Sequence, residues 1–458
     1  MKSRIVLTIL SIMVLCQAYA YDIAVENEDG VIILYNYIND GTELEVDGCT
    51  LGVKKINIPK EVTYRTRTRK VTSIGSRAFE HTGSEYNTHL ESVTIPNSIK
   101  KIGSFAFAYT YLKSVTIPNS VKEIGTHIFY KCRFLESVII SDSVTIINDN
   151  SFYECFNLES VHIGNSVKTI KDCAFARCTS LTSVTIPYSV TTIGGGAFGG
   201  CTGLISVTIP NSVTEIGNGA FKGCSNLSSL IIPNSVTSIG ENAFYGCSNL
   251  SFLNISTPNT EMRIFNNAFS KCTSLTTVTI PPNVKAFGCF AYCTKLSSVT
   301  IYGKLATPLD AYGYDYHPTF EGSNNIISVI IKEGCQSGCA KDCFTDDVFY
   351  NATLYVPIGT KEKYKSQNYW NKFIYIEEGE PTYIYHLSAN DFHIYTKDGV
   401  FYISGMNDGQ CVAIYQIDGK QVASANAYDG TANIVTNLSS GTVAIVKVDD
   451  KAIKVMMK

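Results

Sequence analysis

The sequence predicts a solenoid that is rich in β-strand and is built from coils of 23 residues. Six successive cysteines keep a 23-residue spacing: Cys132, Cys155, Cys178, Cys201, Cys224 and Cys247. A phenylalanine can be followed through ten units: Phe79, Phe107, Phe129, Phe152, Phe175, Phe198, Phe221, Phe244, Phe269 and Phe290. Self-similarity at a period of about 20 to 50 residues is the signature of stacked repeats.

The repeated phrase itself predicts strands and corners. One unit is C-x-x-L-x-x-V-x-I-P-x-S-V-x-x-I-G-x-x-A-F-x-x, as in residues 201–223. Val207 and Ile209 are two apart, so they point to the same side of a strand while Thr208 points outward. The second apolar pair, Val213 and Ile216, lies on the return path, and Pro and Gly mark the corners.

A single coil cannot fold alone. About eight positions of the unit are apolar, and burying each large one contributes about 1.5 to 3 kcal/mol. Ordering the unit costs about 1.5 kcal/mol per residue. Neighbouring coils must therefore cover each other's open faces.

The repeat carries a family resemblance. Residues 92–98, 114–120 and 206–212 all have the sequence S-V-T-I-P-N-S and lead into I-G and then F. Over about residues 70–375, this pattern resembles the BspA-like leucine-rich repeats of bacterial surface proteins. The resemblance implies a right-handed leucine-rich-repeat coil with short turns or helical pieces. It also implies adhesion to host extracellular proteins such as fibronectin or fibrinogen, or to other bacterial cells.

The first 70 residues predict export and a cap. Lys2 and Arg4 precede an apolar run, and Ala18-Tyr19-Ala20 is a small-x-small cleavage site, so residues 1–20 are predicted to be a secretory signal peptide. No later apolar run is long enough to span a membrane. Residues 21–70 are predicted to cap the solenoid, with a hairpin at Asp29-Gly30, because an open coil is an unpaired strand edge.

The solenoid is predicted over residues 71–378, and a separate domain is predicted over residues 381–458. The stretch Leu354 to Pro357, with Tyr364, Trp370 and Phe373, resembles the segment that closes such arrays. Short alternating strands after Pro381 predict an Ig-like β-sandwich. The end of this domain is similar to the type A C-terminal sorting domains of the Bacteroidota secretion pathway. The alternative is an accessory Ig-like domain with no role in export.

Composition excludes nucleic acid as a partner. The chain has 37 Lys and Arg against 40 Asp and Glu, a formal net charge of −3, so it lacks a basic footprint. Only 17% of the residues are charged. The predicted surface is therefore polar and weakly charged.

The chain contains 16 cysteines, which could be free thiols, disulfides or metal ligands. The six regular ones occupy equivalent positions with parallel side chains, which disfavours disulfides and favours buried free thiols. Cys335, Cys339 and Cys343 lie four apart and could hold zinc, form a local disulfide or line the core of a degenerate repeat. We expect neither a metal nor another cofactor.

No local motif indicates catalysis. The segment 194–199 has the pattern G-x-G-x-x-G, but it is in register with the I-G-x-x-A-F phrase of neighbouring units. Repeat glycines therefore explain it better than a nucleotide site.

Two surfaces are candidates for binding. The first is the outward row of the strand phrase, which includes Thr185 and Thr208: Thr94, Thr116, Ile139, His162, Thr185, Thr208, Ile231, Asn254, Thr279 and Thr300. Threonine is also favoured on any pleated surface, so this row can be purely structural. The second is the insertion 309–320, with Tyr312, Tyr314, Asp315, Tyr316 and His317. Such tyrosines supply contact area at low entropic cost, or the loop folds back over the last coils.

These observations predict a monomeric, non-enzymatic protein, secreted or displayed at the cell surface, that contacts an extracellular protein or glycan. One alternative is a structural spacer or coat protein without a dedicated ligand. Another is a secreted glycan-processing enzyme, which would need Asp or Glu clustered in a cleft. A repeat scaffold does not by itself decide among them.

Overall fold

The computed structural model describes residues 21–458, with gaps at 51, 82–88, 307–317, 333–342, 381–384, 387–392, 398–399, 405, 417–419, 429–430, 439–441, 449–450 and 457–458. The predicted signal peptide, residues 1–20, lies outside the described residues. The chain divides into two compact units, Met1–Leu354 with Glu362–Ile376, and Tyr355–Lys361 with Glu377–Lys458. No helix in the described part of the chain is long and apolar enough to cross a membrane.

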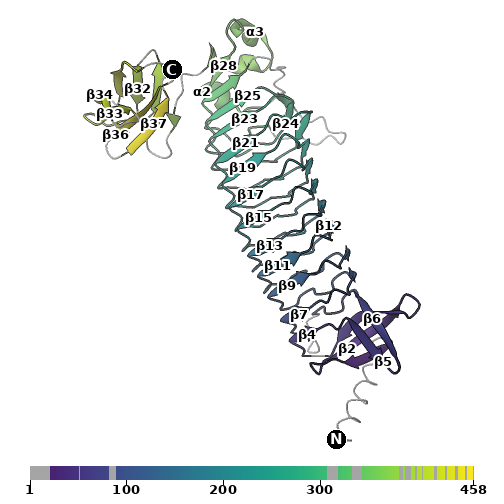
Figure 1. The fold of residues 1–458 in the computed structure, drawn as a ribbon. Helices are drawn as coiled ribbons and strands as arrows, with labels where there is room; N and C mark the ends of the chain where they lie inside the picture. The colour runs from purple at the N-terminus through teal and green to yellow at the C-terminus, as the bar shows by residue number, and fades with distance from the viewer. Residues whose placement is uncertain are drawn as a thin grey trace. The chain divides into compact units, whose positions relative to one another are not determined.

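The first unit contains stacked coils with a row of parallel strands on each of two sides (Figure 1). We call the row formed by the V-x-I phrase the strand ladder, and the row on the return path the return ladder. The strand ladder contains β4(Lys55–Asn57), β7(Ser92–Thr94), β9(Ser114–Ile117), β11(Ser137–Ile140), β13(Ser160–His162), β15(Ser183–Thr185), β17(Ser206–Thr208), β19(Ser229–Ile232), β21(Phe252–Ile255), β23(Thr277–Ile280), β25(Ser298–Ile301) and β27(Ser328–Ile331). The return ladder contains β6(Arg67–Ile74), β8(Lys101–Ile102), β10(Glu123–Ile124), β12(Ile146–Ile147), β14(Thr169–Ile170), β16(Thr192–Ile193), β18(Glu215–Ile216), β20(Ser238–Ile239), β22(Met262–Ile264), β24(Val284–Phe287) and β26(Lys304–Ala306).

The alternation of the repeat phrase sets the inside and the outside of each coil. In β9, Val115 and Ile117 are buried while Ser114 and Thr116 are exposed, and most strands of the ladder repeat this pattern. The predicted β-solenoid is therefore confirmed. Of the short turns or helical pieces expected within the coils, the described coils contain turns.

A column of phenylalanine rings runs through the coils. Phe198 lies between Phe175 and Phe221, with ring centroids 5.3 and 5.2 Å apart. The column extends past the ten predicted positions to Phe320 and Phe344. The sequence count missed Phe320 because the spacing from Phe290 stretches to 30 residues.

The backbone conformation before and after each stacked phenylalanine explains why glycine recurs near it in the sequence. The residues two before and two after the stacked ring have positive φ in most coils, as Gly196 and Gly200 do around Phe198. Glycine adopts this conformation without the steric cost that a Cβ atom brings. Cys173 and Arg177 adopt it around Phe175, so packing of the ring outweighs the local strain there.

The N-terminal segment is partly solenoid. As predicted, β1(Ile23–Glu26) and β2(Ile32–Ile38) form a hairpin around Asp29-Gly30, and β2 continues to β3(Glu43–Cys49). However, β4 pairs in parallel with β7, and Ile56 and Ile58 are buried as in a repeat strand. The first coil therefore begins inside the region predicted to be only a cap. This coil is hard to recognise in the sequence because an antiparallel hairpin, β5(Glu61–Tyr64) with β6, interrupts the repeat phrase.

Aromatic residues close the other end of the phenylalanine column. The ring centroid of Phe373 lies 5.6 Å from that of Phe344 and 5.0 Å from that of Phe349. Trp370 is buried beside these rings. Trp370 and Phe373 therefore lie beside the last ring of the column, and both belong to the segment predicted to close the array. Its elements are α2(Asp346–Asn351), β28(Thr353–Val356), α3(Lys361–Ser366), η1(Trp370–Lys372) and β29(Tyr375–Glu378).

The C-terminal unit has two four-stranded sheets. In order across each sheet, the strands are β30(Tyr385–His386), β31(His393–Lys397), β32(Val400–Ser404) and β35(Thr431–Val435), and β34(Gln421–Asn426), β33(Cys411–Gln416), β36(Val443–Val448) and β37(Lys451–Met456). Phe401 and Ile403 of the first sheet share one buried cluster with Ile414 and Val446 of the second. The unit thus has a core of its own.

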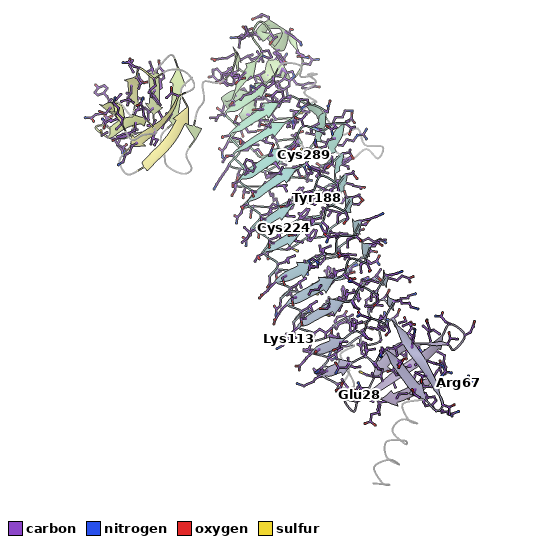
Figure 2. All side chains as sticks on the ribbon, in the orientation of Figure 1. Glu28, Arg67, Lys113, Tyr188, Cys224 and Cys289 are labelled. Carbon is purple, nitrogen blue, oxygen red and sulfur yellow. The ribbon has the colours of Figure 1, made fainter. Side chains whose placement is uncertain are left out.

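Replacing Phe198 by Ala should destabilise the chain by about 3 to 5 kcal/mol, because the ring is fully buried and loses contacts with two neighbours. Thermal unfolding measures this loss. Tyr188→Ala is the control, since that side chain is 80% exposed (labelled in Figure 2) and its loss should cost less than about 0.5 kcal/mol. Equal destabilisation by the two changes would contradict the role of the column.

Candidate binding surface

The strand ladder has an outward surface without a charged side chain from β15 to β25. We call it the neutral face and define it as three rows: the residue before each strand, the first strand residue and the third strand residue. These are Thr182, Ser183, Thr185, Ile205, Ser206, Thr208, Ser228, Ser229, Ile231, Ser251, Phe252, Asn254, Thr276, Thr277, Thr279, Ser297, Ser298 and Thr300.

The register of the ladder brings the predicted threonines together. Thr185 of β15 is directly opposite Thr208 of β17, and both are exposed. Thr279 of β23 is likewise opposite Thr300 of β25. The predicted outward row is therefore in register within each of these sheets, although its geometry does not assign it a ligand.

Charge distinguishes the two halves of the ladder. Before β15, the residue that precedes each strand is usually charged, as in Lys113, Glu136 and Glu159. From β15 onward, the same row contains Thr, Ile or Ser. Because repeats are otherwise similar, the loss of charge marks one half of the surface as chemically different.

The second predicted surface, the tyrosine loop within the insertion 309–320, falls largely outside the described residues. Tyr312, Tyr314, Asp315, Tyr316 and His317 all lie outside the described residues. The prediction about the tyrosine loop therefore stays a prediction.

The cysteine column is part of the core. Cys224 is fully buried, and its thiol donates to the carbonyl oxygen of Phe198 in the preceding coil over 3.2 Å. The same contact recurs along the column, from Cys132 to Phe107 through Cys293 to Phe269. The predicted burial of these thiols is confirmed.

Burial also determines the chemistry of these thiols. It raises the pKa of Cys132 and of Cys247 to about 12, because a thiolate would lose its hydration there. A protonated thiol is a poor nucleophile and a poor metal ligand. The described residues contain no cluster able to hold a metal ion. Cys335 and Cys339 lie outside them, and Cys343 is buried.

The glycine pattern at residues 194–199 belongs to the repeat. These residues follow β16 and form the turn that leads to Phe198. The turn contains no helix whose N-terminus could bind a phosphate. The structure therefore confirms that repeat glycines explain this pattern.

The comparisons with known proteins agree with the repeat architecture. A family model described as the BspA type leucine rich repeat region matches residues 72–205 and 191–317, which is more than half of the chain. No curated protein matches the chain.

Several solved structures are similar to the chain. One is a leucine-rich repeat protein from Bacteroides ovatus, with 27% identity, coverage of 74% of this chain and 79% of that one, and a TM-score of 0.49. Another is a leucine-rich cell surface protein from Faecalibacterium prausnitzii, with 24% identity, coverage of 79% and 96%, and a TM-score of 0.43. The pneumococcal vaccine antigen PcpA has 19% identity, coverage of 79% and 100%, and a TM-score of 0.46.

We expect stability to fall as the pH rises from about 8.5 towards 12. The thiol pKa in an unfolded chain is about 8.5, whereas burial raises the pKa of Cys247 in the folded chain to about 12. Between these values the folded state keeps a proton that the unfolded state releases, so raising the pH favours unfolding by about 1.4 kcal/mol per pH unit for each such thiol. Chemical denaturation at a series of pH values measures this slope.

The variant Cys247→Ala should show a slope that is smaller by about one proton. Cys411→Ala is the matched control, because that side chain is exposed. An unchanged slope in Cys247→Ala would contradict the proposed contribution of the buried thiol.

Proposed function

Because this chain belongs to the BspA-type leucine-rich repeat family, we propose that it is a non-enzymatic binding protein, secreted or displayed at the cell surface, that contacts an extracellular ligand through the neutral face. The proposed role is adhesin-like, and the ligand is a protein or a glycan outside the cell.

The absence of charge on the neutral face carries this proposal. Burying a charged group against a partner costs free energy unless the charge is paired, and charged residues are depleted from the centres of protein interfaces. Hydroxyl groups can both donate and accept, so they pair with polar groups of many ligands. A broad row of exposed Ser and Thr without charges is therefore suited to desolvation by a partner.

The rigidity of the scaffold supports the same role. Successive coils are tied by backbone hydrogen bonds, such as Ile205 N–H to the Thr182 carbonyl at 2.9 Å. The outward side chains therefore have fixed spacing before any ligand arrives. A surface that is already ordered loses less conformational entropy on binding.

A charged pair placed on the neutral face should weaken binding while leaving the fold intact. In the variant Thr185→Lys with Thr208→Glu, the new charges lie opposite each other in the ladder, so they can pair rather than repel. We expect a loss of at least about tenfold in affinity for immobilised fibronectin, fibrinogen or host glycans, because a partner would have to desolvate both charges. Surface plasmon resonance with the purified full-length protein measures the change.

Thr192→Lys is the matched control, because it places a lysine opposite Glu215 on the return ladder. Binding that survives the Thr185 and Thr208 changes but is lost when Tyr312, Tyr314 and Tyr316 become Ala would move the contact to the tyrosine loop. If the folded protein binds no extracellular probe, the spacer hypothesis becomes the better account.

We also propose that the C-terminal unit directs export, as its resemblance to sorting domains implies. Its separate core supports the idea that it can be removed without unfolding the coils. In a Bacteroidota host with the corresponding secretion pathway, deletion of residues 381–458 should leave the protein inside the cell. Immunoblotting of surface and periplasmic fractions measures the outcome, and normal surface display of the deletion variant would exclude the sorting role.

A further inference from the structure

An open groove with a volume of about 590 Å³ interrupts the neutral face between β21 and β23. Phe252 and Asn254 line it from β21, Thr277 and Thr279 line it from β23, and Tyr302 lies on the following coil. The remaining wall residues are Ser251, Leu253, Ile255, Ser256, Thr257, Pro281 and Pro282.

An insertion in the repeat lies at the groove, because Ser256 and Thr257 of the lengthened corner line it. Cys247 and Cys272 are 25 residues apart instead of 23, and the extra residues fall in the corner between β21 and β22. Here β21 ends one four-stranded sheet and β23 begins another, as also happens between β7 and β9 and between β13 and β15. Leu253 is half-buried at this break, as Val93 and Val161 are where two other sheets end, whereas Val207 and Val278 are buried.

Three departures from the repeat meet at this groove. Phe252 occupies the first strand position, which is Ser or Thr in the other coils from β7 to β27, and its side chain is 54% exposed. Asn254 replaces the usual Thr of the outward row, and Tyr302 replaces the usual Pro after the strand. Local repeat rules are most often broken where function requires it.

The lining of the groove is neutral and rich in hydrogen-bonding groups. It contains no charged side chain. Within the described part of the chain, the side chains of Asn254, Thr277 and Thr279 form no hydrogen bond with another residue, whereas the Ser251 hydroxyl donates to the Ser228 carbonyl over 3.3 Å. Two other hollows of similar volume differ, because Glu26, Glu28, Asp29 and Glu61 line one, and Asp172, Glu215 and Glu241 line the other.

The two aromatic side chains at the groove are exposed, Phe252 by 54% and Tyr302 by 36%. Neither Phe252 nor Tyr302 packs against another aromatic ring among the described residues. An exposed aromatic face is apolar and has a negative electrostatic potential, so it attracts the C–H groups of a ligand. The groove thus combines apolar platforms with groups that both donate and accept hydrogen bonds.

We propose that this groove binds a neutral oligosaccharide. A sugar presents C–H faces, which the rings of Phe252 and Tyr302 would cover, and hydroxyl groups, which Asn254, Thr277 and Thr279 would bind. A volume of about 590 Å³ lies within the range of small-molecule sites. This inference rests on the proposed function and names the ligand class for one part of the neutral face.

The geometry disfavours a peptide strand inserted into the break. Such a strand would need its neighbours to be about 9.6 Å apart, twice the ordinary strand spacing. The Cα atoms of β21 and β23 approach within 8 Å of each other, so no strand fits between them. The uncharged lining likewise disfavours sialylated or sulfated glycans, since nothing in it would neutralise their charge.

A glycan array with neutral, sialylated and sulfated oligosaccharides tests the proposal on the purified full-length protein. The test variant combines Phe252→Ser, which restores the usual residue of that row, with Tyr302→Ala. We expect binding to neutral oligosaccharides and a loss of about tenfold or more in affinity in the variant, measured by titration calorimetry. The matched control is Ile139→Ser on β11, which removes a side chain of similar exposure, 49%, from a distant coil.

Neutral glycan binding that the double variant loses and the control keeps would support the proposal. Binding only to charged glycans, or neutral binding that the double variant keeps, would overturn it. Binding to matrix proteins without any glycan binding would also overturn it, but would leave the adhesin-like function standing. Failure of the folded protein in both assays would overturn both proposals.

Discussion

The stacking of each coil on the next one is the interaction on which the rest of this structure depends. The Phe198 N–H donates to the Ala220 carbonyl of the following coil over 2.7 Å, and the Phe198 ring stacks on Phe221. The Cys224 thiol also donates a hydrogen bond to the Phe198 carbonyl oxygen. Ring, backbone and thiol therefore tie neighbouring coils at the same point, and no coil could bury these groups alone.

This constraint divides the repeat into positions that can vary and positions that cannot. Inward Val and Ile must fill a fixed space, because a close-packed interior tolerates little change in volume. Outward positions such as Thr185 and Thr208 have no such requirement. The loss of charge from β15 onward and the departure at Phe252 are therefore informative about binding, since packing does not impose them.

The groove shows how a small change in one corner alters the outer surface without disturbing the core. Two extra residues lengthen the corner between β21 and β22, yet Phe244 and Phe269 still stack with ring centroids 5.1 Å apart. The interior column thus remains continuous across the break. A solenoid can acquire a distinct site in this way at little cost to its stability.

The 23-residue period and the alternation in Val207-Thr208-Ile209 were enough to determine the coil, its buried residues and its outward row, because both patterns are local. Only the tertiary structure showed that β4 starts the ladder and that Phe320 continues the column, since irregular insertions hide both from the period. It also decided where Phe252, Asn254 and Tyr302 meet. Their proximity depends on how the corners of successive coils shift the strands, and no single repeat contains that information.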